Sequence, residues 1–167
     1  ESMLFILLAT ETHENRFESI TGDRLSTELC NIKFVSYDLA PLISFVSFIG
    51  DAIMAAFGIP VGHEDDEDRG VRAGINMISR LWDWNEEREK EGKPPVDMGL
   101  GLNTDKIVAG NIGSSKRMDY TMIGDGVNLA ARLESACKQY NARILISDFT
   151  FKKLKGTYRI CLLYTSP

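Results

Sequence analysis

The first half of the chain alternates between apolar runs and polar stretches that predict a strand and then a helix. Residues 3–9 form an apolar run of strand length, and the polar residues 10–15 predict a loop. Across Leu25–Leu39 the apolar positions step by three or four, which is the period of a helix with one buried face, although residues 34–37 favour a strand. Pro41 then ends this segment.

Two further apolar runs, residues 42–49 and 52–57, flank the dipeptide Gly50-Asp51. Gly-Asp can supply turn residues with positive φ, so the pattern predicts a β-hairpin with a carboxylate at its tip. Such an acid is either a plain turn residue or a metal ligand. The spacing alone favours the plain turn.

A long amphipathic helix is predicted from about Glu67 to Lys90. Four apolar residues are expected on its buried face: Val71, Ile75, Ile78 and Leu81. The acidic stretch His63–Asp68 suits the positive end of the helix dipole. Because it lacks the ligand spacing of an EF-hand loop, we interpret it as a cap and a solvated face rather than a calcium site.

The second half of the chain predicts another hairpin, a strong helix and a buried strand. Residues 96–103 and 106–112 alternate and are expected to pair with each other. A helix is predicted over Val127–Tyr140 and a strand over residues 143–147, with Asp148 as the cap of a short helix that extends through Leu154. This order of elements predicts an α+β fold, a mixed sheet with helices packed on one face.

Composition narrows the function classes. The chain has 167 residues, 44% of them hydrophobic, which is enough for one domain with a real core. Its net charge of −5 argues against a nucleic-acid partner or an anionic membrane surface, since both require a basic patch. The three cysteines, Cys30, Cys137 and Cys161, are widely spaced and predict neither a disulfide framework nor a zinc site, which favours a reducing, cytoplasmic setting.

Two blocks of sequence together resemble the class III nucleotide cyclases, namely the adenylate and guanylate cyclases. The first is Phe48–Gly58, which contains Gly50-Asp51, and the second runs from Met98 to Glu134. The resemblance extends from about Phe48 to about Arg159 and implies a palm-type, ferredoxin-like catalytic domain spanning residues 1–167. Residues 1–47 match poorly. Residues 161–167 depart from the family and are expected to be non-native, and the chain is expected to stop before the family's terminal strands.

The resemblance implies two metal ions, Mg²⁺ or Mn²⁺, held by two aspartates over the nucleoside triphosphate. One aspartate matches Asp51, whereas the other position falls on Leu7, which cannot bind a metal. The loop that follows Leu7 keeps only the threonine, Thr12, of the family's phosphate-binding sequence. The resemblance therefore implies that this chain lacks one metal ligand and most of the family's phosphate-binding sequence.

Asn128 and Arg132 match the family's transition-state pair, in which the asparagine orients the ribose and the arginine stabilises charge on the α-phosphate. Residues at i and i+4 project from one face of a helix, as this role requires. The alternative is that Arg132 is a surface residue paired with Glu134 or Asp125, with Asn128 a helix N-terminal residue.

Base choice in the family depends on two positions that fall here on Ser47 and Thr121. Thr121 fits the adenine-selective pattern, whereas Ser47 lacks the expected cationic donor, so ATP is favoured over GTP. The neighbouring Phe48 and Gly50 are also expected to bind the nucleotide.

The resulting expectation is a phosphorus–oxygen lyase that converts ATP to cyclic AMP and pyrophosphate. Members of the family form their active site across a head-to-tail dimer, either a homodimer or a heterodimer with another cyclase domain. The cyclase domain is often part of a larger membrane-anchored protein. One alternative is a catalytically inactive cyclase-homology domain that acts as a dimerisation or regulatory partner. Another is an active enzyme whose first 47 residues and last few are not native. A diguanylate cyclase is disfavoured, since its Gly-Gly-Asp/Glu-Glu-Phe turn is absent from the sequence.

Overall fold

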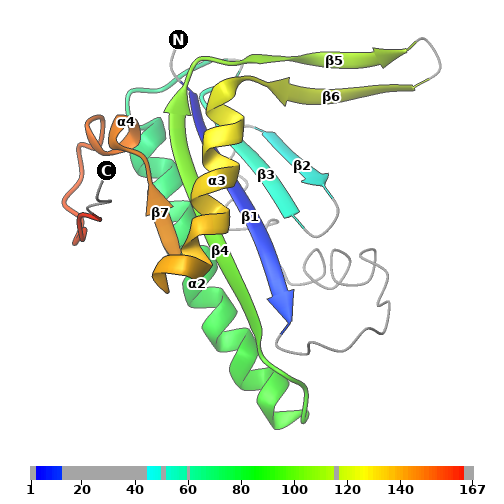
Figure 1. Cartoon of the computed structure of the whole chain (residues 1–167), viewed down its shortest axis with the longest axis vertical. Coiled ribbons are helices and arrows are strands. Elements are labelled where there is room, and N and C mark those ends of the chain that lie inside the picture. The colour runs from blue at the N-terminus through cyan, green and yellow to red at the C-terminus, as the bar shows by residue number, and fades with distance from the viewer. Residues whose placement is uncertain (1–2, 13–44, 50–51, 60, 115–116, 164–167) are drawn as a thin grey trace.

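The computed structural model describes residues 3–12, 45–49, 52–59, 61–114 and 117–163 (Figure 1). Within these residues the centre of the fold is a five-stranded sheet of order β2-β3-β1-β4-β7. Its strands are β1 (Met3–Thr12), β2 (Phe45–Ile49), β3 (Ala52–Phe57), β4 (Val96–Asp105) and β7 (Ile144–Ile146). All neighbours are antiparallel except β4 and β7, which are parallel. The expected mixed sheet of an α+β fold is confirmed.

The first predicted hairpin is confirmed by the pairing of β2 with β3, whose last pair joins Ile49 to Ala52. Gly50 and Asp51, at the predicted turn, lie outside the described residues, as does the helix predicted over Leu25–Leu39. The pairing of the two hairpin strands is therefore observed, while the turn at Gly50-Asp51 remains a prediction.

Strand β1 is longer than predicted. Thr10–Thr12 were expected in a loop, but they continue the strand and pair with β4 as far as Thr12 with Val96. The prediction was wrong because polarity alone suggested a loop, whereas threonine is β-branched and fits a sheet when a partner strand is available.

Helix α2 (Asp66–Lys90) packs on one face of the sheet. Val71, Ile78 and Leu81 are buried as predicted, but Ile75 is 47% exposed. Gly74 takes the sheet-facing position instead: a Cβ added there would lie 3.3 Å from the Leu100 side chain, in tight contact. The buried face of α2 is thus centred on the side that contains Gly74, and Ile75 lies at the edge of this face.

Helix α3 (Asp125–Tyr140) lies on the opposite face, in front of β4 and β1 in Figure 1. Met54 and Ala56 of β3 form a core cluster with Ala130 of α3, while the alternating residues of β3 belong to the α2 cluster. The expectation that the helices share one face therefore needs correction for α3. Glycines at 99 and 101 remove side chains from this face and let α3 approach the backbone of β4.

Strands β5 (Val108–Ser114) and β6 (Arg117–Ile123) pair with each other in a separate two-stranded ribbon, which extends away from the sheet in Figure 1. The predicted pairing of residues 96–103 with 106–112 was wrong. Strand β4 remains paired with β1 as far as Asp105, so β5 finds its partner further along the chain, in β6. Alternation identified the strands but not their partners.

The C-terminal part consists of β7, helix α4 (Asp148–Phe151) and an irregular segment to residue 163. Ser147, and not Asp148, caps α4, because its Oγ accepts the Thr150 backbone N–H at 3.2 Å. None of the helices in the described part is long and apolar enough to cross a bilayer.

Candidate functional site

Asn128 and Arg132 lie one turn apart on α3, and both side chains are exposed. Between them Ala130 is buried against β3, which fixes the opposite side of the helix. Within the part of the chain that the structure describes, no hydrogen bond or ion pair holds either side chain, so the alternative in which Arg132 pairs with Glu134 or Asp125 is not seen. The helix therefore presents an amide and a guanidinium side by side and available to a ligand.

The first turn of α3 is held to β4 at close range. The Asn103 Nδ2 donates to the Gly126 carbonyl at 3.0 Å, and both residues are buried. A Cβ added at Gly126 would stand 2.4 Å from the Asp105 Cβ, and one added at Gly101 would stand 2.1 Å from the Ala130 carbonyl oxygen. The position of Asn128 and Arg132 over the sheet thus depends on backbone contacts with β4. Sequence analysis did not identify Asn103, because nothing local distinguishes it from an ordinary strand asparagine.

The ribbon leads directly into α3, so Thr121 and Asn128 belong to one continuous segment. Thr121 pairs with Gly110 across the ribbon. Near the base of the ribbon, Val108 pairs with Ile123, and these two apolar side chains are 69% and 56% exposed. An apolar cross-strand pair therefore lies exposed close to the start of α3.

The sheet register relates the other predicted site residues. Met54 pairs with Ser47 on one side and with Leu7 on the other, and Leu7 also pairs with Gly101. Ser47, Met54, Leu7 and Gly101 thus form one row across the sheet, and α3 passes over its Gly101 end. Phe48 pairs with Ile53 in the next row. The register places Ser47 and Leu7 in the same row, on either side of Met54, while Gly50 and Asp51 are outside the described residues.

The residues present do not fit a two-carboxylate metal site within one chain. Leu7 has no ligating atom, and β1 stays paired with β4 for five residues beyond it instead of turning to cradle phosphates. In the described ranges there is also no group of three or more His, Cys, Asp or Glu side chains placed to hold a metal. We therefore assign no reaction step to a metal held by this chain alone.

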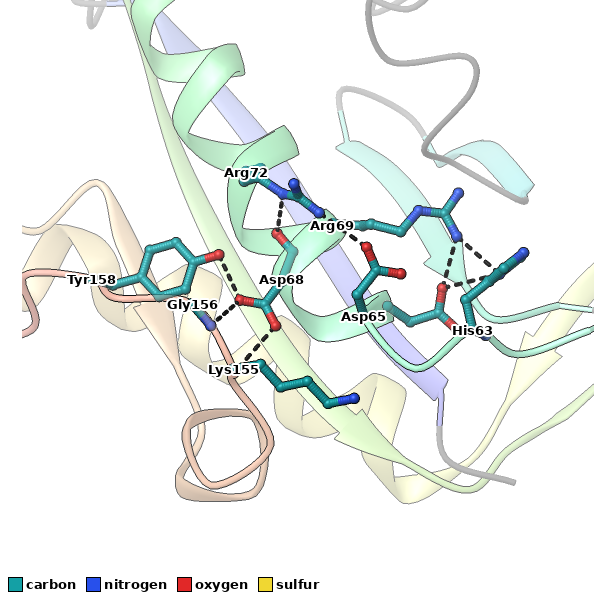
Figure 2. Close-up of polar contacts among 9 residues, drawn as sticks. His63, Asp65, Asp68, Arg69, Arg72, Lys155, Gly156 and Tyr158 are labelled. Atoms are coloured by element: carbon teal, nitrogen blue, oxygen red, sulfur yellow. Dashed lines mark hydrogen bonds and ion pairs between the residues drawn. The ribbon is translucent and has the colours of Figure 1, made fainter.

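Three acids at the start of α2, namely Asp66, Glu67 and Asp68, are buried, so the interpretation as a solvated face is wrong for them, whereas Glu64 is exposed as expected. The Asp68 carboxylate accepts the backbone N–H groups of Lys155 at 2.9 Å and Gly156 at 2.8 Å, and the Tyr158 hydroxyl at 2.7 Å (Figure 2). Asp66 accepts from the His63 backbone N–H. Both carboxylates bond to groups of the chain itself. The partners of Asp66 are local, whereas those of Asp68 lie 87 to 90 residues away, where no local pattern could reveal them.

The bonds to Asp68 set two pKa values. Burial raises the pKa of Asp68, but the N–H and O–H donors around it and the charge of Arg72 outweigh burial and hold the pKa below its ordinary value of 3.8. Burial and the bond to the Asp68 carboxylate raise the pKa of Tyr158 from 10.0 to about 12. The tie between α2 and the C-terminal segment therefore consists of a charged acceptor and neutral donors across the neutral pH range.

An apolar groove of about 930 Å³ lies along another side of α3, between Leu129 and Leu133, strand β7 and α4. None of the predicted site residues lines it. The groove is therefore separate from the candidate site on α3.

Comparison with known proteins gives the family. A sequence profile of the adenylate and guanylate cyclase catalytic domain matches residues 34–163. The adenylate cyclase of Anabaena cylindrica is 38% identical over 111 residues, which are 64% of this chain and 21% of that protein. Adenylate cyclase 1 of Rhizobium meliloti is 31% identical over 123 residues, or 74% of this chain and 18% of that protein. The chain thus spans about a fifth of the length of these relatives.

Solved structures give the same result for the fold. The adenylyl cyclase CyaB from P. aeruginosa superposes with a TM-score of 0.74 at 28% identity, covering 91% of this chain and 79% of that one. The guanylyl cyclase Cya2 superposes with a TM-score of 0.72 at 29% identity, covering 93% of this chain and 79% of that one. The chain therefore belongs to the adenylate and guanylate cyclase catalytic domain family.

Proposed function

We propose that this domain takes part in converting ATP to cyclic AMP and pyrophosphate, and that Asn128 and Arg132 are its contribution to the reaction. The observation that supports the proposal is the pair itself. Both side chains are exposed and free of partners among the described residues, on a helix whose other side is fixed against the sheet. The fixed helix sets where the two side chains begin, and because neither is engaged within the described residues, no internal bond has to break when a ligand binds.

The proposed roles follow from the chemistry of cyclisation. The ribose 3′ oxygen attacks the α-phosphorus, and negative charge builds on the phosphoryl oxygens as pyrophosphate leaves. Arg132 donates to those oxygens and stabilises the charge, while the Asn128 amide holds the ribose in line for attack. Removing a donor of this kind costs on the order of 3 kcal/mol in barrier height.

We propose a head-to-tail dimer in which the second half of the site comes from a partner domain. The exposed Val108–Ile123 pair supports this arrangement, because an apolar patch beside the candidate site is the kind of surface that a partner covers. Since Leu7 leaves the metal site incomplete, the carboxylates for Mg²⁺ or Mn²⁺ would come from that partner. ATP is a cytosolic substrate, so the domain would work in the cytosol, alone or within a larger membrane-anchored protein.

ATP is proposed over GTP on the basis of Thr121, whose hydroxyl can donate or accept one hydrogen bond at the purine edge. Ser47, Phe48 and Gly50 are proposed to line the same nucleotide. Ser47 is too short to replace a lysine donor directly, so discrimination between the two bases is expected to be modest. The relatives include both adenylate and guanylate cyclases.

A second candidate function is that of a regulatory or dimerisation partner without turnover of its own. Leu7 and the uninterrupted pairing of β1 with β4 as far as Thr12 favour it. In that case the domain would support catalysis only when combined with a competent subunit.

Complementation distinguishes these candidates. The chain is assayed for ATP turnover alone and mixed with a cyclase domain of this family that keeps its metal carboxylates but has alanine in place of its own Asn/Arg pair. Activity in the mixture is expected to require this chain. Asn128→Ala or Arg132→Ala should lower kcat about 100-fold with little change in KM, because both groups are assigned to the transition state.

Gln139→Ala is the matched control, since Gln139 is exposed on the same helix about two turns beyond Arg132. It should leave the mixture fully active. A loss that appears mainly in KM would mean that Asn128 and Arg132 bind the substrate in its ground state. An inactive mixture would remove the proposed function.

A further inference from the structure

Asn103 is a buried polar residue in the middle of the fold. A contribution to folding stability does not explain why an asparagine occupies this position. Its side chain is fully buried in β4, and its Nδ2 donates to the Gly126 carbonyl. Among the described residues its Oδ1 has no hydrogen-bond partner. A buried amide with one half unsatisfied carries a desolvation cost, and an apolar side chain of similar size would avoid that cost.

The Gly126 carbonyl does not need Asn103 either. Gly126 lies inside α3, where the carbonyl of residue i accepts the N–H of residue i+4. The bond from Asn103 is therefore additional to the helix's own bond. Its effect is to fix where the first turn of α3 sits above β4.

That turn also packs against Asp105 and Ile107, but it has no side-chain cap. The N-cap of α3 is Gly124, which offers no side chain, so the helix begins without a capping hydrogen bond. The first turn of a helix frays unless its groups are held. Asn103 supplies an anchor from the sheet, two residues before Asn128.

We infer that Asn103 is a positioning residue for Asn128 and Arg132. It acts through the Gly126 carbonyl and makes no contact with substrate. This inference rests on the proposed function of the α3 pair. A displacement of about 1 Å in a group that orients a substrate can cost about 100-fold in rate, so one buried hydrogen bond is enough to matter.

The neighbouring residue provides a matched control. Thr104 is next to Asn103 on β4 and is also buried, but its Oγ1 lies 3.1 Å from the Thr150 Oγ1 and so connects β4 to α4. Thr104→Val removes one buried polar group from the same strand without touching α3. It should reduce global stability and leave kcat of the complemented mixture unchanged.

The test combines hydrogen exchange with complementation kinetics. Asn103→Leu, with Asn103→Ala as the alternative if leucine does not fit, should speed exchange of the amides that hydrogen-bond to the first-turn carbonyls of α3 about 10-fold relative to the amides of its last turn. It should also lower kcat of the mixture about 10-fold or more, with KM within about twofold of the unmodified chain. Thr104→Val should produce neither change.

A second perturbation reaches the same turn from the other side. Gly126→Ala places a methyl against Asp105 and should lower kcat, and Asp105→Gly in the same chain should restore it, because the clash is with the Asp105 side chain. Unchanged kcat and unchanged first-turn exchange in the Asn103 variants would overturn the inference, as would faster exchange without loss of kcat. If the unmodified mixture is inactive, the proposed function fails, and exchange alone then decides whether Asn103 holds the turn.

Discussion

Replacing Gly101 by alanine is expected to damage both the stability and the activity of this domain. A methyl at this position would stand 2.1 Å from the Ala130 carbonyl oxygen and 2.5 Å from the Glu134 backbone nitrogen. Both atoms belong to the backbone of α3, so no side-chain rotation can relieve the clash. Ordinary contact begins at 3.4 Å, so the helix and β4 would have to separate by about 1.3 Å.

The expected cost follows from that separation. Overpacking of a close-packed interior costs about 1–3 kcal/mol, and a clash between two backbones belongs at the upper end. For a domain of this size about 3 kcal/mol corresponds to a fall in Tm of roughly 6–12 °C. Because α3 carries Asn128 and Arg132, kcat of the complemented mixture should fall about 100-fold as well.

Thermal unfolding followed by circular dichroism measures the stability effect, with two glycine controls. Gly99→Ala should cost less, because its methyl would stand 2.9 Å from the Cys137 Cβ and 3.2 Å from the Glu134 carbonyl oxygen, a smaller overlap than at Gly101. Gly110→Ala meets nothing within 4 Å and should be neutral or slightly stabilising. A Gly101→Ala variant with the Tm of the parent, or the same loss at all three sites, would refute the claim that α3 rests on the β4 backbone.

Three other predictions concern the metal site and the hydrogen bonds between Asp68 of α2 and the C-terminal segment. Leu7→Asp should give the chain assayed alone some Mn²⁺-dependent turnover, which the unmodified chain is expected to lack. If Ala9→Asp, at the β1 position paired with Ala52, activates while Leu7→Asp does not, residue 7 is not the missing ligand position. In an absorbance titration of the five tyrosines, Tyr158 should ionise last, near its raised pKa of about 12, and Tyr158→Phe should remove that step. Because the pKa of Tyr158 is raised in the folded state, its protonated hydroxyl stabilises the fold fully below pH 10.0, the ordinary tyrosine pKa. This stabilisation is lost as the pH rises through about 12. Because the pKa of Asp68 is lowered, its carboxylate stabilises the fold above pH 3.8, and this stabilisation is lost as the pH falls below that value. Asp68→Asn should therefore flatten the acid side of the plot of unfolding free energy against pH. Asp65→Asn, at an exposed acid paired with Arg72, should not.

Much of the local structure followed from pattern alone. The helix predicted from about Glu67 to Lys90 and the one predicted over Val127–Tyr140 were both confirmed to within two residues at each end, because a buried stripe of period 3.6 is repeated over several turns. The β2–β3 hairpin was confirmed because two apolar runs flank a turn-forming dipeptide. The family could also be identified, since its motifs are short and continuous in sequence.

The errors concern partners rather than elements. Strand β5 was paired with β4 because they are adjacent in sequence, but β4 is occupied by β1 and β7. The polar end of β1 was placed in a loop because its partner, Val96, is more than 80 residues away. The acids of α2 were placed in solvent because Tyr158, which covers Asp68, is 90 residues away. In each case the deciding contact is long-range, and local propensity contains no information about it.

For the candidate site, the sequence determined which chemical groups are available. Position 7 is a leucine and cannot hold a metal, and Asn128 and Arg132 share a helical face because they are four residues apart. Only the tertiary structure decided that this face is exposed, because α3 packs by its other side on glycines and Asn103 of β4. A side chain's chemistry belongs to its residue, whereas its exposure depends on which distant surface its helix packs against, and that is settled by the packing of the whole chain.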